Sequence, residues 1–128
     1  MSVAVAASEG EMPFYLDTDN PQMHALLPTA DNQAYFTPGK ALMVQVWSFE
    51  RLINYTNWDE VDLVKLDCEG AEFPILLETP AEILKRVKQW LIEYHAAPEP
   101  LEERLRNLGY RVERRKDLIM TGILYASR

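Results

Sequence analysis

The segment VDLVKLDCEGAEF, Val61–Phe73, decides the fold of this chain. Apolar residues dominate its first half and predict a β-strand over residues 61–68. Its second half predicts a turn from the strand into a helix, because Gly70 permits a tight turn and carboxylates favour the first turn of a helix. Lys65 is unexpected inside such a strand, since an unpaired buried charge is destabilising by several kcal/mol.

Helix signals follow on both sides of this segment. Ser48 is placed to cap a helix whose apolar face holds Phe49, Leu52 and Ile53. Residues 71–78 predict a further helical segment. Thr79 opens a capping box with proline at the first helical position, and we expect Ile83, Leu84 and Val87 on the buried side of that helix. Pro100 opens a last helix with a leucine stripe, Leu101, Leu105 and Leu108, which Gly109 ends.

Strands alternate with these helices. Residues 43–48 and 90–95 predict strands on either side of the strand at 61–68, and residues 110–116 and 118–127 predict a closing antiparallel pair. Alternation of strands and helices with largely apolar strands is typical of an α/β sheet with a parallel centre. The fold class is therefore α/β, with antiparallel strands at the edge.

The first third of the chain has another character. Residues 1–17 predict a hairpin around Gly10, and residues 18–42 predict a long loop rich in proline. Such a loop is either a lid or binding loop or a tolerated surface insertion. With an α/β core at 43–128, we expect residues 1–128 to form one domain.

Composition limits the function further. The 128 residues are 48% hydrophobic and carry a net charge of −7, which argues against nucleic acid as a partner. The basic run at 111–116 would alternate across a strand and favours a solvated edge. Cys68 is the single cysteine, so no internal disulfide can form. Neither a signal peptide nor a membrane span is apparent, and we expect a cytoplasmic protein with no membrane partner.

Ionisable residues occupy the predicted central strands. Lys65 and Asp67 share one strand face, and Glu93 and His95 share a face of the next strand. If these strands are parallel neighbours in simple register, Lys65 and Glu93 form a structural ion pair and Asp67 lies near His95. The second pair would lie at the carboxyl ends of the strands, where open α/β sheets bind ligands.

Several roles remain open for these groups. Asp67 and His95 could orient a hydroxyl, act as a general base or share a metal. Glu69 and Glu72 are either functional or serve as cap and dipole residues of the strand–helix turn at Gly70. A metal site of Asp67, Glu69 and His95 is a weaker hypothesis, because the spacing matches no recognised ligand pattern, and we predict no metal. Cys68 would point to the core and is not expected to be catalytic.

The run VDLVKLDCEGAEFPIL resembles the signature of the FkbM-type methyltransferases, an apolar strand followed by K-x-D-x-E-G-x-E. The matching positions are Lys65, Asp67, Glu69, Gly70 and Glu72. The resemblance extends upstream and downstream and implies a class I, Rossmann-like fold. It also implies S-adenosylmethionine-dependent O-methylation of a sugar, polyketide or other small molecule. Asp67 would stand at the end of the fourth strand, facing methyl donor and acceptor, with His95 and Glu69 as further catalytic candidates.

The chain departs from that family in one respect. Its glycines, at 10, 39, 70, 109 and 122, form no G-x-G turn of the kind that holds the cofactor. The resemblance begins at the family's third strand, so we expect a partial class I sheet. We also expect that this chain alone does not catalyse methyl transfer. Exposed strand edges then predict a homodimer or a rearranged strand order. The alternative is a non-catalytic remnant that serves as a binding or oligomeric interaction module.

Overall fold

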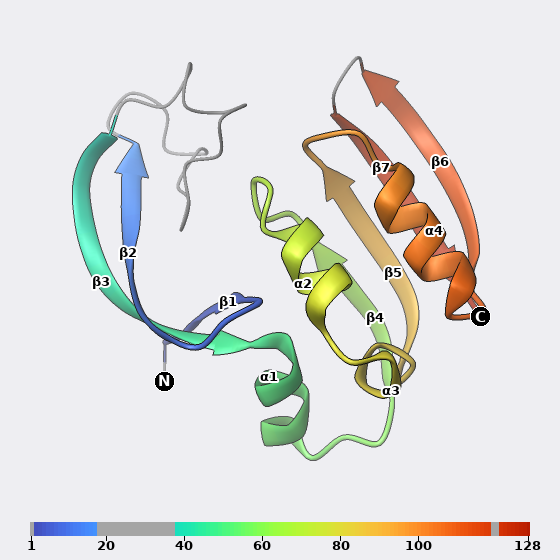
Figure 1. Ribbon diagram of the computed structural model, residues 1–128, viewed down its shortest axis with the longest axis horizontal. Helices are drawn as coiled ribbons and strands as arrows, with labels where there is room; N and C mark the ends of the chain where they lie inside the picture. Colours follow the sequence, from blue (N-terminus) through green and yellow to red (C-terminus); the bar gives the residue numbers. More distant parts are fainter. Residues whose placement is uncertain (1, 18–37, 119–120) are drawn as a thin grey trace.

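The computed structural model describes residues 2–17, 38–118 and 121–128. Its strands form two sheets, a three-stranded sheet of order β1-β3-β2 and a four-stranded sheet of order β4-β5-β7-β6 (Figure 1). The elements in chain order are β1 (Ala4–Ala6), β2 (Gly10–Asp17), β3 (Pro38–Ser48), α1 (Phe49–Thr56), β4 (Val61–Leu66), α2 (Glu72–Glu78), α3 (Ala81–Leu84), β5 (Val87–Tyr94), α4 (Glu99–Asn107), β6 (Arg111–Leu118) and β7 (Thr121–Ser127).

The three-stranded sheet corrects the predicted hairpin. Strands β1 and β2 do not pair with each other; β1 pairs with β3 in parallel, and β2 pairs with β3 antiparallel. Strand β3 has room for both partners because it is 11 residues long. It can begin at Pro38 because proline is tolerated at the first position of a strand. Residues 38–42 are therefore strand and not loop, while the rest of the predicted loop, 18–37, lies outside the described residues.

The four-stranded sheet confirms the α/β class and much of the predicted pairing. Strands β4 and β5 are parallel neighbours, and β6 and β7 form the expected antiparallel pair. The predicted parallel centre is wrong in detail. Strand β4 is at the edge of this sheet, and β7, not a parallel strand, lies on the other side of β5.

One face of the four-stranded sheet carries the core. Helices α2 and α4 lie over this face (Figure 1), and Phe49 of α1 contacts Trp90 of β5 with ring centroids 5.5 Å apart. Ser48 caps α1 as predicted, its Oγ accepting a hydrogen bond from the Arg51 N–H at 3.1 Å. The predicted leucine stripe of α4 is also buried. The largest fully buried apolar side chains of the chain include Trp90, Tyr94, Ile75, Leu76, Leu84, Ile92, Leu101, Leu105 and Leu124.

The helix predicted after Thr79 is shorter than expected. Its cap position is Pro80, with no side-chain capping bond, so the predicted capping box does not form. Thr79 is instead buried at 5% exposure, and α3 is a single turn. Val87, expected on this helix, is the first residue of β5 and pairs with Val61 of β4. Strand pairing has overridden the local helix signal.

The other face of the four-stranded sheet is more open, and we call it the open face. On β4 it carries Lys65 and Leu63, and the Leu63 side chain is 53% exposed. Leu91 of β5 pairs with Lys65 and also belongs to this face. Within the described ranges, no helix combines the length and the apolar character needed to cross a membrane.

Candidate functional site

The carboxyl end of β4 leads into a tight turn. Two residues there have positive φ angles, 49° at Glu69 and 103° at Gly70. Glycine adopts such angles at little cost, whereas a side chain at positive φ is uncommon. The Ala71 N–H donates to the Cys68 carbonyl at 3.1 Å and closes the turn. The strand–turn–helix predicted from the sequence is therefore present, with Gly70 where a tight turn needs it.

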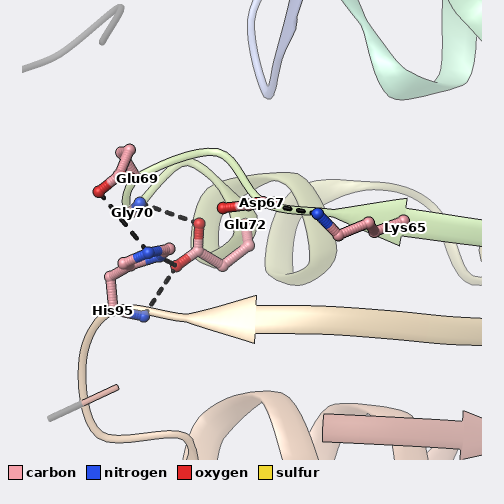
Figure 2. A network of polar contacts seen from close by, with 6 residues as sticks. All are labelled: Lys65, Asp67, Glu69, Gly70, Glu72 and His95. Carbon is pink, nitrogen blue, oxygen red and sulfur yellow. Dashed lines mark hydrogen bonds and ion pairs between the residues drawn. The ribbon is translucent and has the colours of Figure 1, made fainter. Parts of the chain in front are cut away.

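Glu72, the first residue of α2, holds this turn against β5 (Figure 2). Its side chain is 0% exposed. Its Oε2 accepts a hydrogen bond from the Gly70 N–H at 2.9 Å, and its Oε1 accepts one from the His95 N–H at 3.1 Å. A buried carboxylate must be compensated by donors. Glu72 is compensated by the backbone of the two segments that it joins.

The same carboxylate contacts the imidazole of His95. Nδ1 of His95 lies 3.1 Å from Oε1 of Glu72, and a carboxylate can only accept, so Nδ1 carries the proton. Nε2 lies 3.6 Å from Oε2 of Glu69. The hydrogen bond to Glu72 is the main cause that raises the pKa of His95 above its usual 6.5. Burial raises the pKa of Glu69, although His95 acts in the opposite direction.

The ion pair predicted between Lys65 and Glu93 is corrected. Nζ of Lys65 lies 2.9 Å from Oδ2 of Asp67, the residue that follows β4 (Figure 2). The simple register assumed from the sequence was wrong, because Lys65 is the partner of Leu91 in the β4–β5 pair. Glu93 still acts on Lys65 through its charge, and Asp67 and then Glu93 raise the pKa of Lys65. The lysine is tolerated in the strand because its side chain is 57% exposed.

Asp67 and His95 lie near each other, as the strand analysis predicts. Ligand atoms of Asp67, Glu93 and His95 all lie within 4.8 Å of one another. We call these three residues the strand-end trio. Glu93 replaces Glu69 in the three-residue set considered from the sequence. The observed register explains why Glu93 lies beside Asp67. Leu66 of β4 pairs with Ile92 of β5, and the residues that follow these two are Asp67 and Glu93.

Cys68 is half-buried, and its side chain packs against the hydrophobic core. Burial raises the pKa of its thiol, which disfavours the reactive thiolate. The predicted position of Cys68 against the core is confirmed. His24, the other histidine of the chain, lies outside the described residues.

Comparison with known proteins adds a family to this geometry. A family model described as the methyltransferase FkbM domain matches residues 1–112. The match includes both sheets up to the start of β6 and all residues of the strand-end cluster: Lys65, Asp67, Glu69, Gly70, Glu72, Glu93 and His95. No curated protein and no solved structure matches the chain.

Proposed function

The chain belongs to the FkbM methyltransferase family, and on that premise we propose that it takes part in S-adenosylmethionine-dependent methylation of a hydroxyl group. The acceptor would be a small molecule or a sugar. The observation that supports this most is the gathering of Asp67, Glu69 and His95 at the carboxyl ends of β4 and β5. Open α/β sheets bind their ligands at that edge.

The charge of the cluster suits a cationic methyl donor. The cationic partners described beside this cluster are Lys65 and His95. The cluster holds four carboxylates: Asp67, Glu69, Glu72 and Glu93. S-adenosylmethionine brings a positively charged sulfonium when bound. A fixed excess of carboxylates in a partly shielded site would favour a positive charge over a neutral one.

The residues also suit the acceptor. A methyltransferase must place the acceptor oxygen and remove its proton. We assign Asp67 and His95 to hold the hydroxyl, because both reach solvent at the strand ends. We assign Glu69 as the proton acceptor, since burial brings its pKa closer to neutral pH and a general base works best with its pKa near the working pH.

The donor side fits less well. The 128 residues contain no pair of glycines spaced as G-x-G, and such a turn lets the backbone approach a cofactor closely. We propose that residues outside this sequence supply this part of the pocket and that the 128 residues alone do not turn over. Calorimetry of this chain with S-adenosylmethionine would then give no binding heat at millimolar ligand. Tight binding would contradict the proposal for the donor side.

The activity itself is tested on the polypeptide that carries these residues in its native host. Tritium-labelled S-adenosylmethionine is offered with extracts of hydroxylated small molecules, and products are identified by mass spectrometry. We expect label in an O-methyl group. Label in amines or thiols alone would contradict methylation of a hydroxyl.

A second candidate function is a non-catalytic interaction module. The observation that favours it is the outer edge of β4, which pairs with no strand among the described residues, beside the exposed Leu63. Unpaired edges favour association through added strands. We propose a homodimer on this ground, and analytical ultracentrifugation tests it. A monomer at all micromolar concentrations would contradict the dimer.

A further inference from the structure

The strand-end trio has the composition of a metal site. We propose that Asp67, Glu93 and His95 bind one divalent transition-metal ion at the carboxyl ends of β4 and β5. Glu93 lies on β5, and Asp67 and His95 directly follow the last residues of the parallel neighbours β4 and β5. They offer two carboxylate oxygens and one imidazole nitrogen, whose ligand atoms lie within 4.8 Å of one another.

Binding of one ion would require these ligand atoms to move closer together. Ligand atoms that bind one ion at about 2.1 Å lie at most about 4.2 Å apart. Adjacent ligands of one ion lie about 3.0–3.4 Å apart in octahedral or tetrahedral geometry, so the side chains of the trio, whose ligand atoms lie within 4.8 Å of one another, would move together by up to about 1–2 Å. Asp67 is exposed and Glu93 is half-exposed, so both carboxylates have room to make this adjustment.

The imidazole of His95 is held in place by a residue outside the trio. Glu72, which is fully buried, accepts the hydrogen bond from Nδ1 of His95. In the neutral ring, Nε2, which lies 3.6 Å from Oε2 of Glu69, then carries the lone pair. Histidine ligands commonly donate the other ring N–H to a carboxylate, which fixes the ring and raises its basicity. The buried Glu72 would serve the His95 ligand in this way.

Lys65 shows that the trio stabilises positive charge. Its ammonium group lies 2.9 Å from Oδ2 of Asp67. Lys65 is exposed and can turn away from Asp67 when an ion binds. The lysine is therefore a competitor of the metal ion, and its removal should strengthen metal binding.

The donor set selects the class of ion. Carboxylate oxygens suit Mg²⁺, Ca²⁺ and Mn²⁺, whereas imidazole suits Zn²⁺, Fe²⁺ and other transition metals. A site with two oxygens and one nitrogen favours Mn²⁺, Fe²⁺ or Zn²⁺. Three protein ligands leave coordination positions for water or for an acceptor oxygen, whose proton the ion would make more acidic. That last role alone rests on the proposed function.

Mn²⁺ titration followed by electron paramagnetic resonance tests the site, because bound Mn²⁺ loses the six-line signal of the free ion. We expect one bound ion per chain. Asp67→Asn and Glu93→Gln should each weaken binding by at least about tenfold. Asp62→Asn is the matched control, because Asp62 lies on β4, the strand that Asp67 follows, has a side chain that is 87% exposed and pairs with Lys88. It should bind as the wild type does.

The nitrogen ligand has its own signature. Electron spin-echo modulation of bound Mn²⁺ should show coupling to an imidazole nitrogen that His95→Gln removes and His24→Gln retains. Lys65→Met should tighten binding. Thermal unfolding followed by circular dichroism shows that each variant is folded.

Two outcomes would overturn the metal site. One is the absence of Mn²⁺ binding at millimolar concentration, and the other is an equal loss of affinity in Asp62→Asn and Asp67→Asn, as expected from a diffuse effect of the net charge of −7. Neither outcome involves methyl transfer. The proposed function would then remain, with Asp67 and His95 holding the hydroxyl directly.

Discussion

The two faces of the four-stranded sheet differ in what they do. On β5, Trp90, Ile92 and Tyr94 point to the helix-covered face and are exposed by 0%, 0% and 2%. Leu91 and Glu93 alternate with them, point to the open face and are only half-buried. One strand therefore contributes to the core with every second residue and to the candidate site with the others. The covered face holds the residues that stabilise the fold, whereas the open face holds residues that are available for chemistry.

The largest effect is expected on the covered face. Trp90→Ala should destabilise the chain by about 3–5 kcal/mol, because it leaves a cavity in a close-packed core. Leu91→Ala on the open face should cost less than about 1.5 kcal/mol, since its side chain is already partly in water. Urea unfolding measures both. Equal losses would mean that the two faces are packed alike.

A smaller effect is expected from changing Glu72, the buried residue that joins the turn after β4 to the end of β5. Glu72→Gln keeps the size of the side chain but removes the negative charge of the carboxylate that accepts hydrogen bonds from Gly70 and His95. We expect a loss of about 1–3 kcal/mol, the usual effect of disturbing a buried hydrogen-bonded group. The pKa of His95 should fall towards 6.5, which NMR titration of the imidazole measures. An unchanged pKa would show that Glu72 does not control His95.

A smaller effect is expected on the pH dependence of stability. The pKa of His95 is raised in the folded chain, so protonation favours the folded state. The stability gained from His95 is fully present below pH 6.5, the ordinary value, and is lost as the pH rises through the raised pKa. The charged groups that act on it are Glu72, Glu69 and Asp67.

The difference in melting temperature between wild type and His95→Gln should therefore shrink from mildly acidic to alkaline pH. His24→Gln, which removes the other histidine of the chain, is the control, and we expect no such trend in it. A difference that grows with pH would contradict the assigned sign.

The sequence was sufficient for features set by local chemistry. Gly70 and the residues around it predicted the strand–turn–helix, and Ser48 predicted the cap of α1, because each depends on a few adjacent residues. The proximity of Asp67 and His95 followed from the parallel pairing of two apolar strands. Hydrophobic periodicity and capping signals in the sequence are enough to predict these features.

Other features depended on contacts between distant residues. The β4–β5 register is set where Val61 meets Val87, and no local signal gave that pair, so Lys65 was assigned to the wrong carboxylate. Glu72 looked the same as any acidic residue in a first helical turn. Its burial is a consequence of how α2 packs against the end of β5, which residue spacing does not reveal.

The proposed methyl-transfer site at the strand ends is tested most directly by the ratio of two rates. Initial rates of methyl transfer are compared between Asp67→Asn and Asp62→Asn in the native polypeptide, since each variant removes one carboxylate from the same strand region. We predict that Asp67→Asn lowers kcat by about 100-fold, because the acceptor hydroxyl is no longer held in place, while Asp62→Asn keeps the wild-type rate. Equal rates in the two variants would contradict the assignment of the strand ends as the site of chemistry.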